Sequence, residues 1–149
     1  MNPFSIREAL LAKHAQHVVL IHFPIALFLT GVAFDFIAQV TKRSALAAAA
    51  YYNFIVAAIS APVVIATGLL AWQLQLEGQK LKGILLQHLV LGVTSGVLIC
   101  LVWFIHFRSR RGQGTPLPTY RLPLELAAVA LVALTGHLGG FLSGVNIPS

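Results

Sequence analysis

Four long apolar runs restrict the fold of this chain more than any other feature. They cover about residues 18–40, 51–72, 84–107 and 122–142 of a 149-residue sequence. Each is close to the roughly 20 residues that an α-helix needs to cross a hydrocarbon core of about 30 Å. Because lipid offers the backbone no hydrogen-bond partners, such segments must be helical. The sequence therefore predicts an all-α integral membrane protein with four spanning helices.

The composition and the connections support one membrane domain over residues 1–149. The chain is 58% hydrophobic and 9% charged, a balance that excludes an ordinary soluble domain. Short connections make neighbouring helices antiparallel, so we expect a four-helix up-down bundle. The net charge of +6 flanks the helices and does not indicate a nucleic-acid partner. The expected surroundings are a lipid membrane, and the sequence leaves an oligomer open.

The first 16 residues predict an interfacial segment, because apolar and charged side chains alternate there like those of an amphipathic surface helix. The apolar run that follows exceeds the roughly 7–15 residues of a signal-peptide core, so we interpret it as the first spanning helix. Basic residues set the orientation. One end of the bundle carries Lys42, Arg43, Arg108, Arg110, Arg111 and Arg121; the other carries Arg7, Lys13, Lys80 and Lys82. Six against four predicts that the first end is cytoplasmic, with both termini in the periplasm of a bacterial inner membrane.

Three histidines fall at the same depth in separate apolar runs, namely His22, His88 and His137. An ionisable side chain in lipid is costly and usually faces the bundle interior or a polar path. Neutral imidazole binds metals and is an axial ligand of haem iron. We therefore predict a metal site of these three residues, in the form of a haem b with His22 and His88 as the axial pair and His137 as the substitute. His17 would hold a second haem or bind a propionate.

Glycines near these histidines leave room for a bulky planar group. Gly92 follows His88 by one helical turn, and Gly136 precedes His137. Gly68 belongs to the same outer layer, near the end of the second run. We predict that all three border the cofactor. The alternative is close helix packing through small residues, which is common in membranes.

The two halves of the chain echo each other. His22 and His88 are 66 residues apart, and the Thr-Gly pairs at 67–68 and 135–136 are 68 residues apart. This spacing predicts two repeated helical hairpins. An axis along the membrane normal would then make His22 and His88 symmetry mates that face each other.

The opposite half of the membrane contains Asp35, His106 and Glu125. We interpret a pairing of Asp35 with His106 as a structural polar contact, with a proton relay or a second cofactor site as the alternative. Asp35 could equally pair with Lys42 or Arg108. The single cysteine, Cys100, is interpreted as packing.

Several motifs resemble a known family. The stretch HVVLIHFPI resembles the opening of the domain-of-unknown-function family 2231, which consists of small four-helix bacterial membrane proteins, and it also resembles the membrane module of planctomycete-type cytochrome c proteins. The resemblance covers about residues 14–145 and implies a four-helix module that accompanies cytochrome c domains. The matching stretches are 17–25, 67–71, His88 with Gly92, and 135–140.

Departures from that pattern limit what the resemblance implies. Val18 stands where the family often has proline, and Leu89 and Val90 stand where an Arg-Trp pair is common. The chain has no CxxCH motif, so it carries no covalent haem of its own.

The leading hypothesis is a cytochrome b-like electron-transfer subunit rather than a stand-alone enzyme. Its partner would be a periplasmic cytochrome c or a larger redox complex, and a quinone is compatible with it. Two alternatives stay open. One is a cofactor-free membrane anchor of a redox complex, and the other is a histidine-lined metal or proton pathway.

Overall fold

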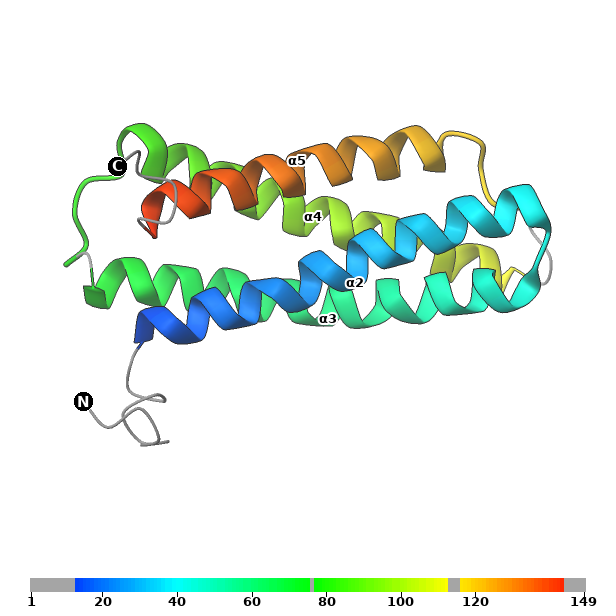
Figure 1. Cartoon of the computed structure of the whole chain (residues 1–149), viewed down its shortest axis with the longest axis horizontal. Coiled ribbons are helices and arrows are strands. Elements are labelled where there is room, and N and C mark those ends of the chain that lie inside the picture. The colour runs from blue at the N-terminus through cyan, green and yellow to red at the C-terminus, as the bar shows by residue number, and fades with distance from the viewer. Residues whose placement is uncertain (1–12, 76, 113–115, 144–149) are drawn as a thin grey trace.

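The computed structural model describes residues 13–75, 77–112 and 116–143, which form four helices (Figure 1). The helices are α2 (Lys13–Thr41), α3 (Ser44–Gln75), α4 (Gly83–Arg111) and α5 (Arg121–Leu142). All four are long and apolar enough to cross a membrane. The predicted all-α fold is confirmed. The helix α3 begins seven residues before the predicted run, because residues 44–50 are rich in alanine, the strongest helix former.

The helices form an up-down bundle. The helix α2 packs along α3, α3 along α4 and α4 along α5, and a smaller contact of α2 with α5 closes the ring. In this order α2 and α4 are diagonal neighbours. The turn between α2 and α3 consists of Lys42 and Arg43. Lys42 has a φ of +57°, a left-handed conformation that glycine usually supplies after a helix.

The core lies around two phenylalanine rings. Phe28 of α2 and Phe54 of α3 are fully buried, with ring centroids 5.8 Å apart. Gly31 permits this contact, because a Cβ atom there would lie 2.7 Å from the Phe54 ring. Large apolar side chains such as Ile59 and Val40 point outward instead and are about two-thirds exposed. This arrangement suits a bundle whose outer surface faces lipid.

The predicted interfacial segment lies mostly outside the described residues. The structure describes the chain from Lys13, where α2 begins, so residues 13–16 belong to that helix. An amphipathic surface helix over the residues before them stays a prediction.

Candidate functional site

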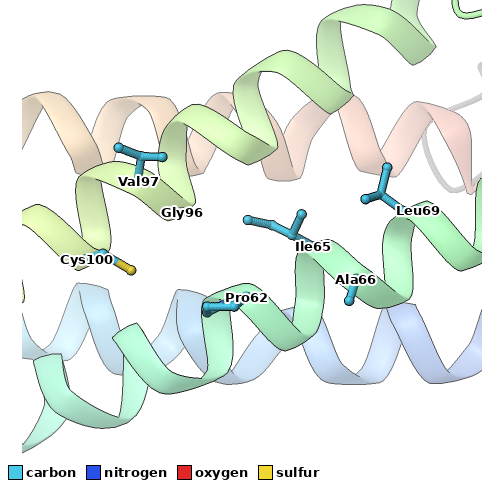
Figure 2. A pocket seen from close by; sticks show the side chains of 7 residues that line it. All are labelled: Pro62, Ile65, Ala66, Leu69, Gly96, Val97 and Cys100. Carbon is cyan, nitrogen blue, oxygen red and sulfur yellow. The ribbon is translucent and has the colours of Figure 1, made fainter.

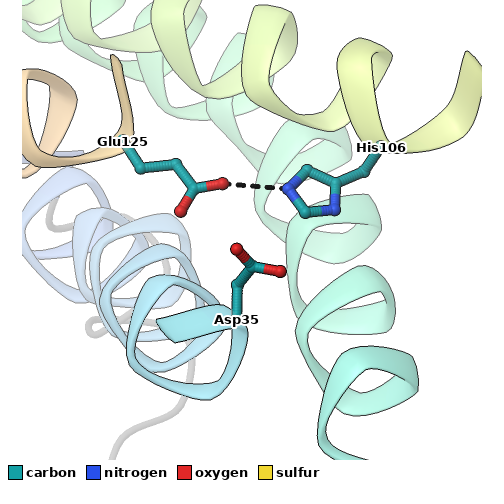
Figure 3. A group of neighbouring side chains, drawn as sticks. All are labelled: Asp35, His106 and Glu125. Carbon is teal, nitrogen blue, oxygen red and sulfur yellow. Dashed lines mark hydrogen bonds and ion pairs between the residues drawn. The ribbon is translucent and has the colours of Figure 1, made fainter. Parts of the chain in front are cut away.

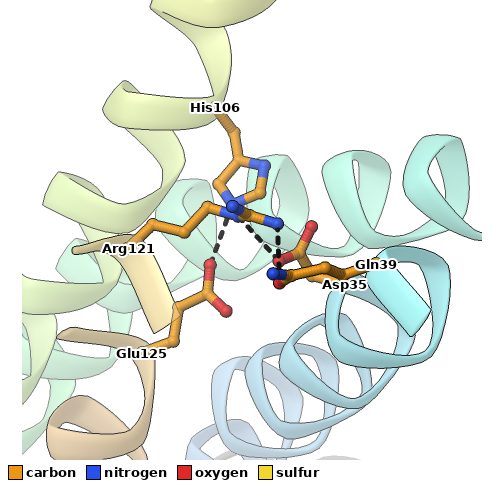
Figure 4. Close-up of polar contacts among 5 residues, drawn as sticks. All are labelled: Asp35, Gln39, His106, Arg121 and Glu125. Atoms are coloured by element: carbon orange, nitrogen blue, oxygen red, sulfur yellow. Dashed lines mark hydrogen bonds and ion pairs between the residues drawn. The ribbon is translucent and has the colours of Figure 1, made fainter. Parts of the chain in front are cut away.

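Four ionisable side chains meet in one buried layer of the bundle (Figures 3 and 4). Asp35 comes from α2, His106 from α4, and Arg121 and Glu125 from the first turns of α5. Their exposed fractions are 2%, 4%, 9% and 0%. Two of the four acidic residues in the chain are therefore buried together, which requires a compensating arrangement. We call these four residues the ionisable cluster.

Two ion pairs hold the ionisable cluster together. Nε2 of His106 lies 2.9 Å from Oε1 of Glu125. Nε of Arg121 donates to Oδ2 of Asp35 at 2.9 Å, and its Nη2 donates to Oε1 of Gln39 at 3.1 Å. Among the described residues, the second oxygen of Glu125, Oε2, is buried without a hydrogen-bond partner, and it points toward the side where Asp35 lies (Figure 3). The site thus retains one buried acceptor that a further proton or cation would satisfy.

Helical spacing places these side chains. Asp35 and Gln39 are one turn apart on α2, and Arg121 and Glu125 are one turn apart on α5, so each pair shares a helix face. The Phe54 ring of α3 stacks near the His106 ring at a centroid distance of 4.7 Å. All four helices therefore contribute to the layer, three with polar groups and α3 with an apolar wall.

The charges of the ionisable cluster do not balance by themselves. Two carboxylates and one guanidinium leave one negative charge while His106 is neutral. One ligand atom from each of Asp35, His106 and Glu125 lies within 4.8 Å of the other two, which is close enough to gather around a cation. An uncompensated charge in a membrane interior is costly, so the layer favours one additional positive charge.

A polar pocket of about 350 Å³ connects this layer with one end of the bundle. Its wall includes Asp35 and Arg121 at the inner end and Lys42 from the turn between α2 and α3. The remaining lining residues are Ala38, Gln39, Ala47, Leu117 and Thr119. The ion pair of Asp35 with Arg121 therefore borders this pocket, although both residues are largely buried.

A second hollow, of about 310 Å³, lies between α3 and α4 and is apolar (Figure 2). Pro62 and Ile65 of α3 and Gly96 of α4 contribute to its wall. Cys100 also lines it, with its Sγ 3.8 Å from the Ala58 carbonyl oxygen. This hollow offers no polar chemistry beyond that thiol.

In the part of the chain that the structure describes, His22, His88 and His137 do not form a group close enough to hold one metal ion. His22 is exposed, and its Nδ1 donates to the Val18 carbonyl of the same helix at 2.7 Å. His137 is exposed as well, with its ring 5.0 Å from that of Phe141. Two axial imidazoles must approach one iron from opposite sides. In this structure Nδ1 of His22 is engaged with its own helix, and a haem with His22 and His88 as its axial pair stays a prediction.

His88 and His17 instead face the second helix of their own hairpins. Nδ1 of His88 donates to the Thr135 carbonyl oxygen of α5 at 3.1 Å. Nδ1 of His17 lies 3.0 Å from Oγ1 of Thr67 on α3. The Thr67 hydroxyl donates to the Val64 carbonyl, so it accepts from His17. Both imidazoles therefore carry their proton on Nδ1.

The structure gives the surroundings of the three glycines that were predicted to border a cofactor. A Cβ at Gly92 would lie 3.7 Å from the Thr135 methyl group, and one at Gly136 would meet nothing within 4 Å. Gly68 lies next to the His17 ring, because a Cβ atom at Gly68 would be 3.0 Å from Cε1 of His17. The glycine next to the His88 ring is Gly139, where a Cβ atom would lie 3.1 Å from Cε1 of His88. Gly139 was not among the predicted glycines.

These contacts make His17, rather than His22, the residue of the first hairpin whose contact resembles that of His88. His17 contacts Thr67, and His88 contacts the corresponding Thr135. His88 follows His17 by 71 residues, and His106 follows Asp35 by the same interval. Each of these two histidines thus joins the two helices of its own hairpin, while the repeat of the hairpins stays a prediction.

The partners in the ionisable cluster differ from those expected. Asp35 pairs with Arg121 rather than with Lys42 or Arg108, and His106 bonds Glu125 rather than Asp35. Arg121 had been counted as a flanking charge. Because Arg121 is buried in the bundle, the flanking lysine and arginine residues number five at one end and four at the other. The available signal was an arginine four residues before a glutamate at the start of an apolar run.

Comparison of the sequence with known proteins identifies its family. A family model described as "Predicted membrane protein (DUF2231)" matches residues 13–145, which include all four helices. The comparisons with curated proteins and with solved structures find no match. The chain is a multi-pass membrane protein that belongs to the DUF2231 family.

Proposed function

We propose that the protein binds and releases a proton at the ionisable cluster. The observation that carries the proposal is the charge imbalance of a buried layer with two carboxylates and one guanidinium. One proton on the contact between His106 and Glu125 makes the layer neutral, which is the inexpensive state in a membrane. A divalent metal would leave the layer with one positive charge while Arg121 remains in place. A proton therefore suits this site better than a metal ion.

The polar pocket supports exchange with one face of the membrane. It reaches Asp35 and Arg121 from the end that carries the turn between α2 and α3. On the other side of the layer, one to two turns along the helices, lie the buried apolar side chains of Phe28, Val102 and Val132. These groups offer a proton no hydrogen-bonded path. The basic bias assigns the pocket end to the cytoplasm, and this orientation is part of the proposal.

Infrared difference spectroscopy tests the proposal on purified protein in lipid nanodiscs. A change of pH should alter the carboxyl and imidazole bands of the buried pair, and Glu125→Gln should remove those changes. Glu77→Gln is the matched control, because Glu77 is an exposed residue of the connection between α3 and α4. A wild-type difference spectrum that persists in Glu125→Gln would contradict proton binding at this site.

Electron transfer through haem is the second candidate, and the placement of His88 favours it. The bond from Nδ1 to the Thr135 carbonyl fixes the ring and leaves Nε2 with the lone pair that metals bind. A haem here would take its other axial ligand from a residue other than His22. A cytochrome c partner and the role of a membrane anchor stay predictions.

An absorption spectrum after expression with added haem tests this candidate. A Soret band that disappears in His88→Ala and persists in His22→Ala is the expected result, because His22 bonds its own helix. A colourless protein would exclude haem and leave the proton proposal untouched.

A further inference from the structure

The polar pocket has an excess of positive charge at its mouth. Among the residues that the structure describes, the charged ones that line it are Asp35, Lys42 and Arg121. Arg121 and Asp35 neutralise each other at 2.9 Å, so Lys42 supplies a net charge of one. A ligand with a single negative charge would balance the pocket.

Hydrogen-bond donors line the same pocket. Gln39 and Thr119 line the pocket with an amide and a hydroxyl group. The bonds from Arg121 to Asp35 and Gln39 use two of the five N–H groups of its guanidinium. Arginine and lysine together with hydroxyl groups are typical partners of phosphate oxygens.

The pocket also lies where α2 ends and α5 begins. Lys42 follows directly after the last residue of α2, and Arg121 begins α5. The basic end of α4 lies at the same end of the bundle (Figure 1), where the Arg110 guanidinium is 4.1 Å from the Tyr51 ring centroid. Aromatic and basic side chains gather at the membrane–water interface. A phospholipid in the adjacent leaflet would therefore carry its phosphate level with the pocket.

The backbone of Lys42 is a further sign that this residue has a specific position. Its φ of +57° is a conformation that residues with a Cβ adopt at an energetic cost. The neighbouring Arg43 carries the same charge and does not line the pocket.

We propose that this pocket binds the phosphodiester group of an anionic phospholipid. Lys42 supplies the balancing charge, while Gln39, Thr119 and Arg121 supply hydrogen bonds. A headgroup without a cation, such as that of phosphatidylglycerol, fits the charge. Phosphatidylcholine would bring its ammonium group toward Lys42. The pocket shares Asp35 and Arg121 with the ionisable cluster, whereas Lys42 lines the pocket and is not part of that cluster.

Native mass spectrometry of the delipidated full-length protein, titrated with short-chain lipids in detergent, tests this proposal. Phosphatidylglycerol should bind more tightly than phosphatidylcholine of the same chain length. One lysine at the headgroup layer contributes enough for Lys42→Gln to weaken phosphatidylglycerol binding about fivefold. Arg43→Gln makes the same change in charge one residue away and should alter binding by less than about twofold.

Two results would overturn the proposal. Equal losses in Lys42→Gln and Arg43→Gln would mean that lipids respond to the general charge of this end rather than to the pocket. Displacement of phosphatidylglycerol by millimolar inorganic phosphate would assign the site to a free anion. Thermal unfolding of both variants shows whether either loss reflects misfolding.

Discussion

Replacement of Arg121 with glutamine is expected to destabilise the bundle by about 3–5 kcal/mol, because it leaves a buried carboxylate without its partner. The carboxylate is that of Asp35, which is 2% exposed and bonds Nε of Arg121 at 2.9 Å. Unfolding in mixed detergent micelles, followed by circular dichroism, measures the free energy.

The double variant Asp35→Asn/Arg121→Gln separates the ion pair from packing. Removal of both charges should recover most of the stability lost in Arg121→Gln, because no charge remains uncompensated. If the two single losses instead add up in the double variant, the pair does not act as a unit. A loss below about 1 kcal/mol in Arg121→Gln would mean that the pair behaves like an exposed one.

Replacement of Phe54 with alanine is expected to cost about 3 kcal/mol, the lower end of the range for buried aromatic residues in soluble proteins. The lower end applies because lipid is as apolar as the bundle interior, so the loss comes from the cavity and its missing contacts. Phe54 is fully buried and contacts both Phe28 and His106 through its ring. The cavity would therefore also loosen the wall of the ionisable cluster.

Ile59→Ala is the matched control for this change. Ile59 lies on the same helix but is 67% exposed, so its side chain faces lipid. Its removal should change the unfolding free energy by less than about 0.5 kcal/mol. Equal losses in the two variants would contradict the assignment of core and lipid-facing surfaces.

The fold could be predicted from the sequence because lipid imposes a simple constraint. Apolar runs near 20 residues must be helices, and short connections make neighbours antiparallel. Helix ends were less certain, since the alanine-rich start of α3 at residues 44–50 extends the helix without belonging to the most apolar run. The direction in which each side chain points depends on helix rotation, which hydropathy alone does not determine.

That rotation explains the differences at the candidate sites. His17 and His22 are five residues apart, so they lie on different faces of α2, and the structure turns His17 rather than His22 toward α3. Arg121 looked like an interfacial charge because it begins an apolar run. Its partner Asp35 is 86 residues away in the sequence, and only the packing of α2 against α5 brings them together.

Proton binding at the ionisable cluster can be tested by counting the protons that the protein takes up. Purified wild type, Glu125→Gln and Glu77→Gln would be compared by titration between about pH 5 and 10, with proton uptake counted per chain. Wild type and Glu77→Gln should each take up about one proton more than Glu125→Gln. Equal uptake by wild type and Glu125→Gln would contradict proton binding at this cluster.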